Sequence, residues 1–143
     1  MDKTSVKVLL VEDNSADARL VKEMLSDPWI VPFELTVSPQ LSEALPMLAN
    51  NNFDVILLDL LLPDSQGMET FTKVHAASPE TPVVVMSGLN DMNLAVAAVQ
   101  EGAQDYLPKG HADSSALMRS IRYAMERKRL EEELRQTLDM LRK

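Results

Sequence analysis

Short runs of apolar residues alternate along the chain with longer stretches in which apolar residues recur every three or four positions. An unbroken apolar run is typical of a buried strand, and the wider spacing is typical of a helix with one buried face. The five runs occupy residues 6–11, 33–37, 55–58, 83–86 and 105–107. This alternation predicts an α/β fold in which five parallel strands are each followed by a helix, with helices on both faces of the sheet.

The composition of each run predicts the place of its strand in the sheet. Runs 6–11, 55–58 and 83–86 are almost uniformly apolar, so we expect them in the centre, buried on both faces. Run 33–37 alternates between apolar and polar residues and run 105–107 is short, which favours edge positions for both. The strand order 2-1-3-4-5 of a flavodoxin-like, doubly wound (βα)5 sheet satisfies these requirements.

Composition and charge narrow the setting in which the protein works. Its 143 residues suffice for one domain, and the lack of cysteine excludes disulfides and thiolate metal sites. The first residues do not resemble a signal peptide and no apolar stretch is long enough to cross a membrane, so we expect a cytoplasmic protein without a membrane partner. The net charge is −8, which argues against direct binding of nucleic acid.

One carboxylate interrupts the most apolar part of the chain. Asp59 follows the run 55–58 and precedes three leucines and a proline. A charge in such surroundings is costly unless it is paired, hydrogen-bonded or bound to a metal, so Asp59 is a candidate site residue. An acidic residue at the solvated end of a strand would give the same local pattern, and this segment alone leaves both interpretations open.

Polar side chains stand at the carboxyl ends of four predicted strands. Glu12 and Asp13 follow the first strand, Asp59 the third and Ser87 the fourth, while Lys109 follows the fifth. Ligands bind at this edge of an open parallel sheet, where the strand order reverses. Three crowded carboxylates repel one another unless a cation neutralises them, and Mg²⁺ is the hard, oxygen-seeking ion expected here. Such a site could stabilise a phosphoryl group in transfer to a carboxylate oxygen.

Each of these residues has an ordinary explanation when it is taken alone. Glu12 and Asp13 favour the N-terminus of the following helix, Ser87 before a glycine is common in turns, and a lysine beside a glycine is common in solvated loops. Their joint placement at one edge of the sheet indicates a site.

The chain resembles the receiver domains of two-component response regulators. The resemblance covers roughly residues 5–125, and it rests on four motifs that occur in the order found in the family. The motifs are VLLVEDN (8–14), DVILLDLLLPDSQG (54–67), PVVVMSG (82–88) and GAQDYLPKG (102–110).

The resemblance implies a role for each residue of the predicted site. Asp59 would accept the phosphoryl group from a histidine kinase or phosphotransfer protein. Asp13 and Glu12 would bind Mg²⁺ together with Asp59 and the backbone carbonyl of Leu61, and Lys109 would hold a phosphoryl oxygen. The protein would then be a switch rather than an enzyme, with self-phosphorylation and self-dephosphorylation of Asp59 as its only chemistry.

The resemblance also implies how the signal is read and how long it lasts. Ser87 would be the switch hydroxyl and Tyr106 the switch aromatic, with the face of helix four, strand five and helix five as the readout. Leu61 and Leu89 occupy positions that control the access of water in this family. Two bulky apolar side chains there predict slow loss of the phosphoryl group.

The last 30 residues predict one long helix. From Asp113 to Arg142 there is no glycine or proline, and a helix of about 30 residues would extend about 45 Å, beyond the domain. We expect a receiver domain at residues 1–125 and an extension of helix five at residues 126–143. The apolar spacing of the extension is typical of a coiled-coil seam, although a solvated tail would carry a similarly short pattern. The seam positions are Leu130, Leu134, Thr137 and Leu141.

The extension is compatible with a receiver inside a longer protein and with a stand-alone receiver. It resembles the connector that joins receivers to sensor, histidine-kinase or cyclic-dinucleotide output modules, so we expect the N-terminal receiver of a longer protein. The alternative is a stand-alone receiver that acts as a phosphorelay intermediate or a protein-binding adaptor. A homodimer could form through this helix or through the face of helix four, strand five and helix five.

Two other classes of protein fit the sequence less well. Phosphatases with an aspartyl-phosphate intermediate commonly carry a second aspartate two residues after the nucleophile, where this chain has Leu61. A flavin or nucleotide site needs a loop that can cradle phosphates, and the loop after the first strand, EDNSAD, is acidic and free of glycine.

Overall fold

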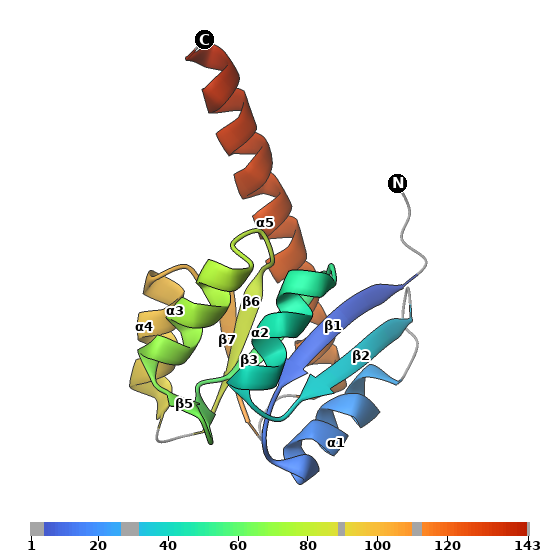
Figure 1. Ribbon diagram of the computed structural model, residues 1–143. Coiled ribbons are helices and arrows are strands. Elements are labelled where there is room, and N and C mark those ends of the chain that lie inside the picture. Colours follow the sequence, from blue (N-terminus) through green and yellow to red (C-terminus); the bar gives the residue numbers. More distant parts are fainter. Residues whose placement is uncertain (1–4, 27–31, 89–90, 110–112, 143) are drawn as a thin grey trace.

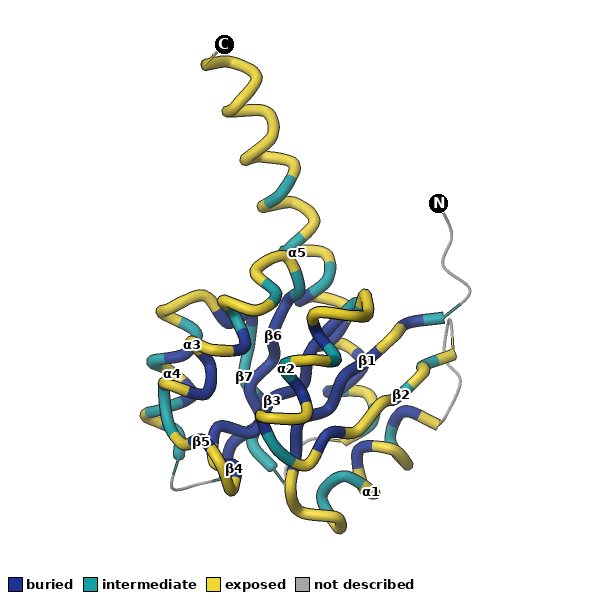
Figure 2. Tube along the Cα trace, in the orientation of Figure 1, coloured by how far each residue is buried: buried dark blue, intermediate teal, exposed yellow. Residues whose placement is uncertain are grey.

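The computed structural model describes residues 5–26, 32–88, 91–109 and 113–142, and these contain a five-stranded parallel sheet at the centre of the molecule (Figure 1). The strand order is β2-β1-β3-β6-β7, which confirms the predicted order. The strands are β1 (Val6–Val11), β2 (Phe33–Ser38), β3 (Val55–Asp59), β6 (Val83–Ser87) and β7 (Asp105–Pro108). Every residue of β3 and β6 is buried, as expected for central strands, and β2 and β7 form the edges (Figure 2).

Helices cover both faces of the sheet. α1 (Ser15–Leu25) and α5 (Ser114–Leu141) pack on one face, and α2 (Leu41–Asn50), α3 (Met68–Ala77) and α4 (Met92–Gln100) pack on the other. Successive residues of a strand point to opposite faces, so each central strand contributes to two apolar cores. In β1, Leu10 packs with the first pair of helices and Leu9 with the other three.

Local sequence signals mark three of the helix ends. The side chain of Asn14 accepts hydrogen bonds from the backbone N–H groups of Ala16 and Asp17, at 2.9 and 3.0 Å, and so caps α1. Asp113 caps α5 in the same way, through Ala116 N–H at 2.8 Å. Gly102 follows α4 with a φ of 128°, a conformation that side chains with a Cβ disfavour.

The N-terminus of α2 is capped from a distant segment. Asp64 lies between two short antiparallel strands, β4 (Leu61–Leu62) and β5 (Ser65–Gln66), that the apolar pattern did not predict. Its carboxylate accepts hydrogen bonds from Leu41 N–H at 2.9 Å and Ser42 N–H at 2.8 Å, and these bonds lower the pKa of Asp64. The loop that follows Asp59 is therefore anchored to α2.

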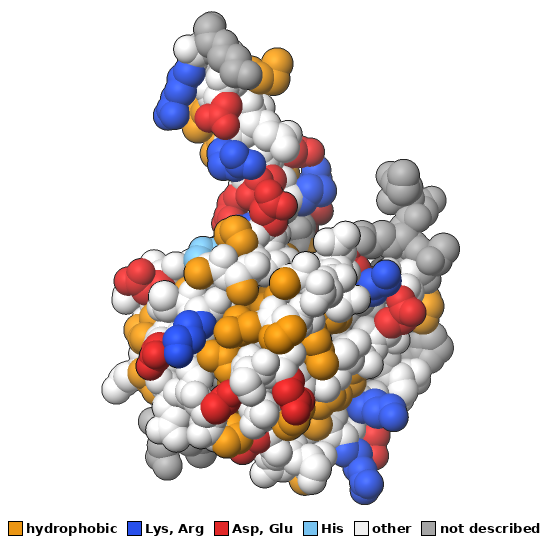
Figure 3. Space-filling view, in the orientation of Figure 1, with side chains coloured by type: hydrophobic (Ala, Val, Ile, Leu, Met, Phe, Trp, Pro, Cys, Tyr) orange, Lys and Arg blue, Asp and Glu red, His pale blue; other side chains and the backbone are white. Residues whose placement is uncertain are grey.

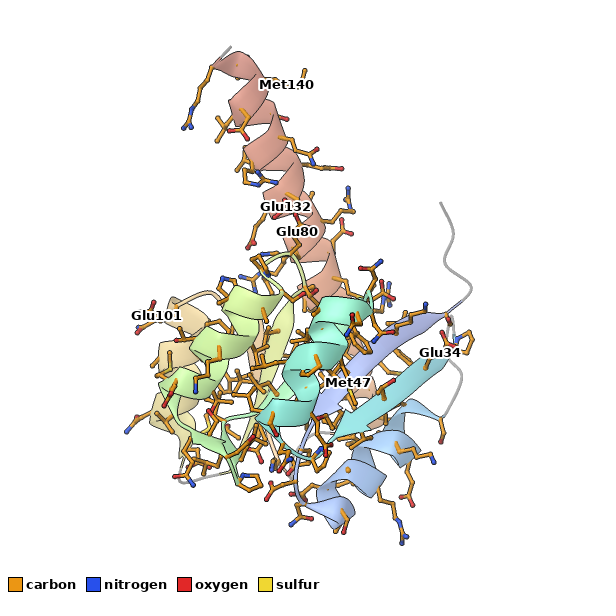
Figure 4. The ribbon with its side chains drawn as sticks, in the orientation of Figure 1. Glu34, Met47, Glu80, Glu101, Glu132 and Met140 are labelled. Carbon is orange, nitrogen blue, oxygen red and sulfur yellow. The ribbon has the colours of Figure 1, made fainter. Side chains whose placement is uncertain are left out.

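The second half of α5 projects beyond the domain as a continuous helix (Figure 1). Where it leaves the domain, Arg127 donates to the backbone carbonyl of Gln104 at 3.0 Å, and the buried side chain of Gln104 donates to Glu131 at 3.2 Å. Gln104 directly precedes β7, so the projecting helix is held by the strand that leads to Lys109. Opposite charges mix along the projection, and Met140 extends from its far end (Figures 3 and 4). Among the described helices, none is long and apolar enough to cross a membrane.

Candidate functional site

Three carboxylates meet where β1 and β3 end. Val11 pairs with Leu58 in the parallel register, which brings the residues that follow, Glu12 and Asp59, side by side. Together with Asp13 they offer oxygen atoms that all lie within 4.8 Å of one another. Glu12 and Asp59 are buried and Asp13 is exposed, so the cluster opens to solvent on one side.

The ammonium group of Lys109 lies among these carboxylates and also reaches α1. Its Nζ is 2.8 Å from Asp59 Oδ2, 2.6 Å from Glu12 Oε2 and 3.3 Å from Asp17 Oδ2. The backbone fixes this position, because Lys109 N–H donates to the carbonyl of Ser87 at 2.7 Å and so continues the ladder between β6 and β7. The lysine is therefore the cation that balances the carboxylates of the site.

Burial and charge change the acidity of both partners in this cluster. Burial raises the pKa of the Glu12 carboxyl to about 7, with repulsion from Asp59 adding to the effect and the hydrogen bond from Lys109 opposing it. Burial by itself lowers the pKa of Lys109, but hydrogen bonds to Asp59 and Glu12 outweigh it, and the pKa lies above its ordinary value. Lys109 is therefore charged at neutral pH, and burial makes the Glu12 carboxyl a weaker acid than an exposed glutamate.

The Asp59 carboxylate is held at both oxygens. Oδ2 accepts from Lys109, and Oδ1 accepts from the backbone N–H of Leu61 at 3.0 Å. The side chain lies at the end of β3 and is almost fully buried. These contacts hold the carboxylate in one orientation, as a nucleophilic carboxylate requires.

Ser87 and Tyr106 lie on the two neighbouring strands of the same half of the sheet. The buried Ser87 hydroxyl donates to Met92 Sδ at 3.6 Å, and a thioether is a weak acceptor. Tyr106 is half-buried on the edge strand β7 and packs against the apolar core beneath α2, α3 and α4. Both positions agree with the sequence prediction, and their switching roles stay predictions.

The donor atoms of the carboxylate cluster fit a hard divalent cation. Mg²⁺ takes oxygen ligands and keeps several of its waters, so a few carboxylates suffice to hold it. Glu12, Asp13 and Asp59 supply such oxygens close together, and Lys109 forms ion pairs with Glu12 and Asp59. That the Leu61 carbonyl is a further ligand stays a prediction.

The structure brings most of the predicted site together and adds one residue. Glu12, Asp13, Asp59 and Lys109 form one cluster, whereas Leu89 lies outside the described residues. The sequence prediction did not include Asp17, which contacts Lys109 from the first turn of α1. The only sequence feature that could have identified Asp17 is its position four residues after Asp13. An acidic residue in the first turn of a helix is common for another reason, the favourable interaction with the helix dipole.

Comparisons with known proteins agree with this geometry. Residues 8–122 match the response regulator receiver domain family. The C4-dicarboxylate transport transcriptional regulatory protein DctD of Rhizobium meliloti is 31% identical over 123 residues, which are 86% of this chain and 26% of DctD. The cell cycle transcriptional regulator CtrA of Caulobacter vibrioides is 32% identical over 104 residues, 73% of this chain and 44% of CtrA.

A solved structure shows the same fold. The receiver domain protein from Clostridium thermocellum superposes with a TM-score of 0.76 at 28% identity, covering 87% of this chain and 98% of that one. The chain spans less than half of each of the two curated relatives, so those proteins contain further regions.

Proposed function

The chain belongs to the response regulator receiver domain family, the phosphorylation-dependent switches of two-component signalling, and from this premise we propose that Asp59 is the phospho-acceptor. The observation that carries the proposal is the Asp59 carboxylate, held between Lys109 Nζ and Leu61 N–H beside two further carboxylates. Receiver domains take their phosphoryl groups from histidine kinases or phosphotransfer proteins, and we propose a donor of this class for Asp59. We also propose that the transfer takes place in the cytoplasm.

The proposed reaction transfers a phosphoryl group from a phosphohistidine to Asp59. A carboxylate oxygen of Asp59 forms a bond to phosphorus while the bond from phosphorus to the histidine nitrogen breaks, and the electron pair stays on that nitrogen. Lys109 then donates to a phosphoryl oxygen. Mg²⁺, held by Glu12, Asp13, Asp59 and the Leu61 carbonyl, would supply positive charge for the phosphoryl oxygens.

Ser87 and Tyr106 are proposed to turn this chemistry into a conformational signal. The bond from the Ser87 hydroxyl to Met92 Sδ is weak, so a phosphoryl oxygen is the better acceptor. Movement of Ser87 toward the phosphate would leave space that the half-buried Tyr106 can enter. The face formed by α4, β7 and α5 would then differ between the two states.

Leu61 is proposed to protect the modified aspartate from water. Its side chain is 39% exposed, and its N–H donates to Asp59, so it lies at the solvent side of the carboxylate. We expect wild-type protein to lose the phosphoryl group over minutes or longer. Leu61→Ala should shorten this time several-fold, and Leu20→Ala, a change at an exposed leucine of α1, should not. Decay of the adduct followed by mass spectrometry checks this, and a wild-type half-life of seconds would contradict it.

Residues 126–143 are proposed to form a connector that pairs with the same segment of a second copy, beyond a receiver at residues 1–125. Four leucines repeat along the projecting helix at spacings of four, four and three, which places them on one face. All four are exposed, between 44% and 76%, although they are large and apolar. They are Leu130, Leu134, Leu138 and Leu141, so this face includes Leu138 in addition to three of the seam positions predicted from the sequence.

This pairing predicts that a charge on the leucine face prevents dimer formation. Leu134→Glu should weaken the dimer at least about tenfold, because a carboxylate would be buried without a partner. Gln136→Glu introduces the same charge away from the leucine face and is expected to have little effect. Sedimentation equilibrium of the protein treated with acetyl phosphate and Mg²⁺ measures both, and equal association of Leu134→Glu and wild type would exclude this interface.

The proposed function is tested by the metal dependence of self-phosphorylation. With Mg²⁺ and acetyl phosphate, the intact protein should gain about 80 Da, the mass of one phosphoryl group. An excess of chelator should prevent the gain, because the carboxylates then repel the phosphoryl oxygens. No gain in mass with Mg²⁺, or an equal gain with chelator, would overturn the proposal.

A further inference from the structure

We propose that Asp17 is a positioning residue that competes with the phosphoryl group for Lys109 and thereby sets the affinity of the site for phosphoryl oxygens. Asp17 Oδ2 lies 3.3 Å from Lys109 Nζ, on the side of the ammonium that faces α1. The other two contacts of Nζ, to Asp59 and Glu12, belong to the carboxylate cluster. The inference rests on the proposed function, because it concerns the same lysine.

The surroundings of Asp17 separate it from the metal-binding carboxylates. Its side chain is 39% exposed, compared with 2% for Glu12 and 9% for Asp59. It is not among the carboxylates whose oxygens lie within 4.8 Å of one another. Asp17 is therefore a neighbour of Lys109 rather than a member of the cluster.

The position of Asp17 is fixed independently of Lys109. Its backbone N–H donates to the Asn14 side chain at 3.0 Å, which holds it in the first turn of α1. A carboxylate is favourable in that turn because it faces the positive end of the helix dipole. The helix thus holds a negative charge beside the ammonium in the unmodified protein.

Phosphorylation adds negative charge at Asp59 and leaves the charge of Asp17 unchanged. The modified Asp59 carries up to two negative charges, and Lys109 must turn its N–H groups toward the new oxygens. The Asp17 carboxylate attracts Lys109 back toward α1 and repels the phosphoryl oxygens across a short distance. Both effects weaken anion binding, so removing the charge of Asp17 should strengthen it.

Beryllofluoride with Mg²⁺ tests the inference at equilibrium, because this anion imitates a phosphoryl group on a carboxylate without requiring turnover. At saturating Mg²⁺, Asp17→Asn is expected to bind beryllofluoride about fivefold more tightly than wild type. Asp17→Glu keeps the charge and should stay close to wild type. Glu23→Gln removes the same charge from an exposed position of α1 and is the matched control. Binding is measured by 19F NMR.

Kinetics give a second readout that a purely structural role would not change. Asp17→Asn should lower KM for acetyl phosphate by a similar factor and leave kcat nearly unchanged, since the effect is on anion binding. Unchanged or weaker beryllofluoride binding by Asp17→Asn, or an equal change in Glu23→Gln, would overturn the role of Asp17. Failure of the wild-type protein to bind beryllofluoride would overturn the proposed function as well. The wild-type result therefore tests the proposed function, and the comparison of variants tests the role of Asp17.

Discussion

Asp59→Asn is expected to abolish the gain of about 80 Da on treatment with acetyl phosphate and Mg²⁺. Asparagine has nearly the same shape as aspartate, so the packing at the end of β3 should survive. Its amide lacks the negative charge and the nucleophilic oxygen that the transfer requires. Intact-protein mass spectrometry measures the result directly.

The matched control for this variant is Asp139→Asn, which removes the same charge from the exposed, projecting part of α5. It should be modified as fast as wild type. An adduct that forms undiminished in Asp59→Asn would show that another group accepts the phosphoryl group, and the proposed site would then be wrong.

Lys109→Ala is expected to slow adduct formation by about 100-fold or more, the cost typical of removing one preorganised donor from a developing negative charge. It should also destabilise the fold in the absence of a metal, because Glu12 and Asp59 would lose their shared cation while buried. Mg²⁺ should restore much of this stability, since it binds the folded protein preferentially. The Tm of Lys109→Ala should therefore rise more with Mg²⁺ than the Tm of wild type.

Lys73→Ala is the control for the loss of a lysine, because Lys73 pairs with Glu69 on the surface of α3, away from the carboxylate cluster. Its rate of adduct formation and its Tm should stay close to those of wild type. Lys109→Ala modified at the wild-type rate would mean that the lysine does not contact the phosphoryl group.

The central sheet and its polar edge could be predicted because burial constrains the sequence there. A strand buried on both faces must be almost uniformly apolar, so the order of strands follows from β1, β3 and β6. A parallel sheet also brings the residues after its strands to one edge, which is why Glu12, Asp59 and Lys109 could be grouped before any distance was known.

The parts that the sequence did not predict depend on contacts between distant segments. Asp64 caps α2 from 22 residues away, and nothing in the local pattern distinguishes it from a solvated turn residue. Asp17 reaches Lys109 across 92 positions, and the two meet only because α1 begins, and β7 ends, at the same edge of the parallel sheet.

The most direct test is to locate the phosphoryl group on the chain. Wild-type protein is incubated with acetyl phosphate and Mg²⁺, reduced with borohydride to convert the acyl phosphate to homoserine, and digested for tandem mass spectrometry. We predict homoserine at position 59. Homoserine at another aspartate, or unreduced aspartate at position 59 in protein that carries the adduct, would contradict the assignment of Asp59 as the phospho-acceptor.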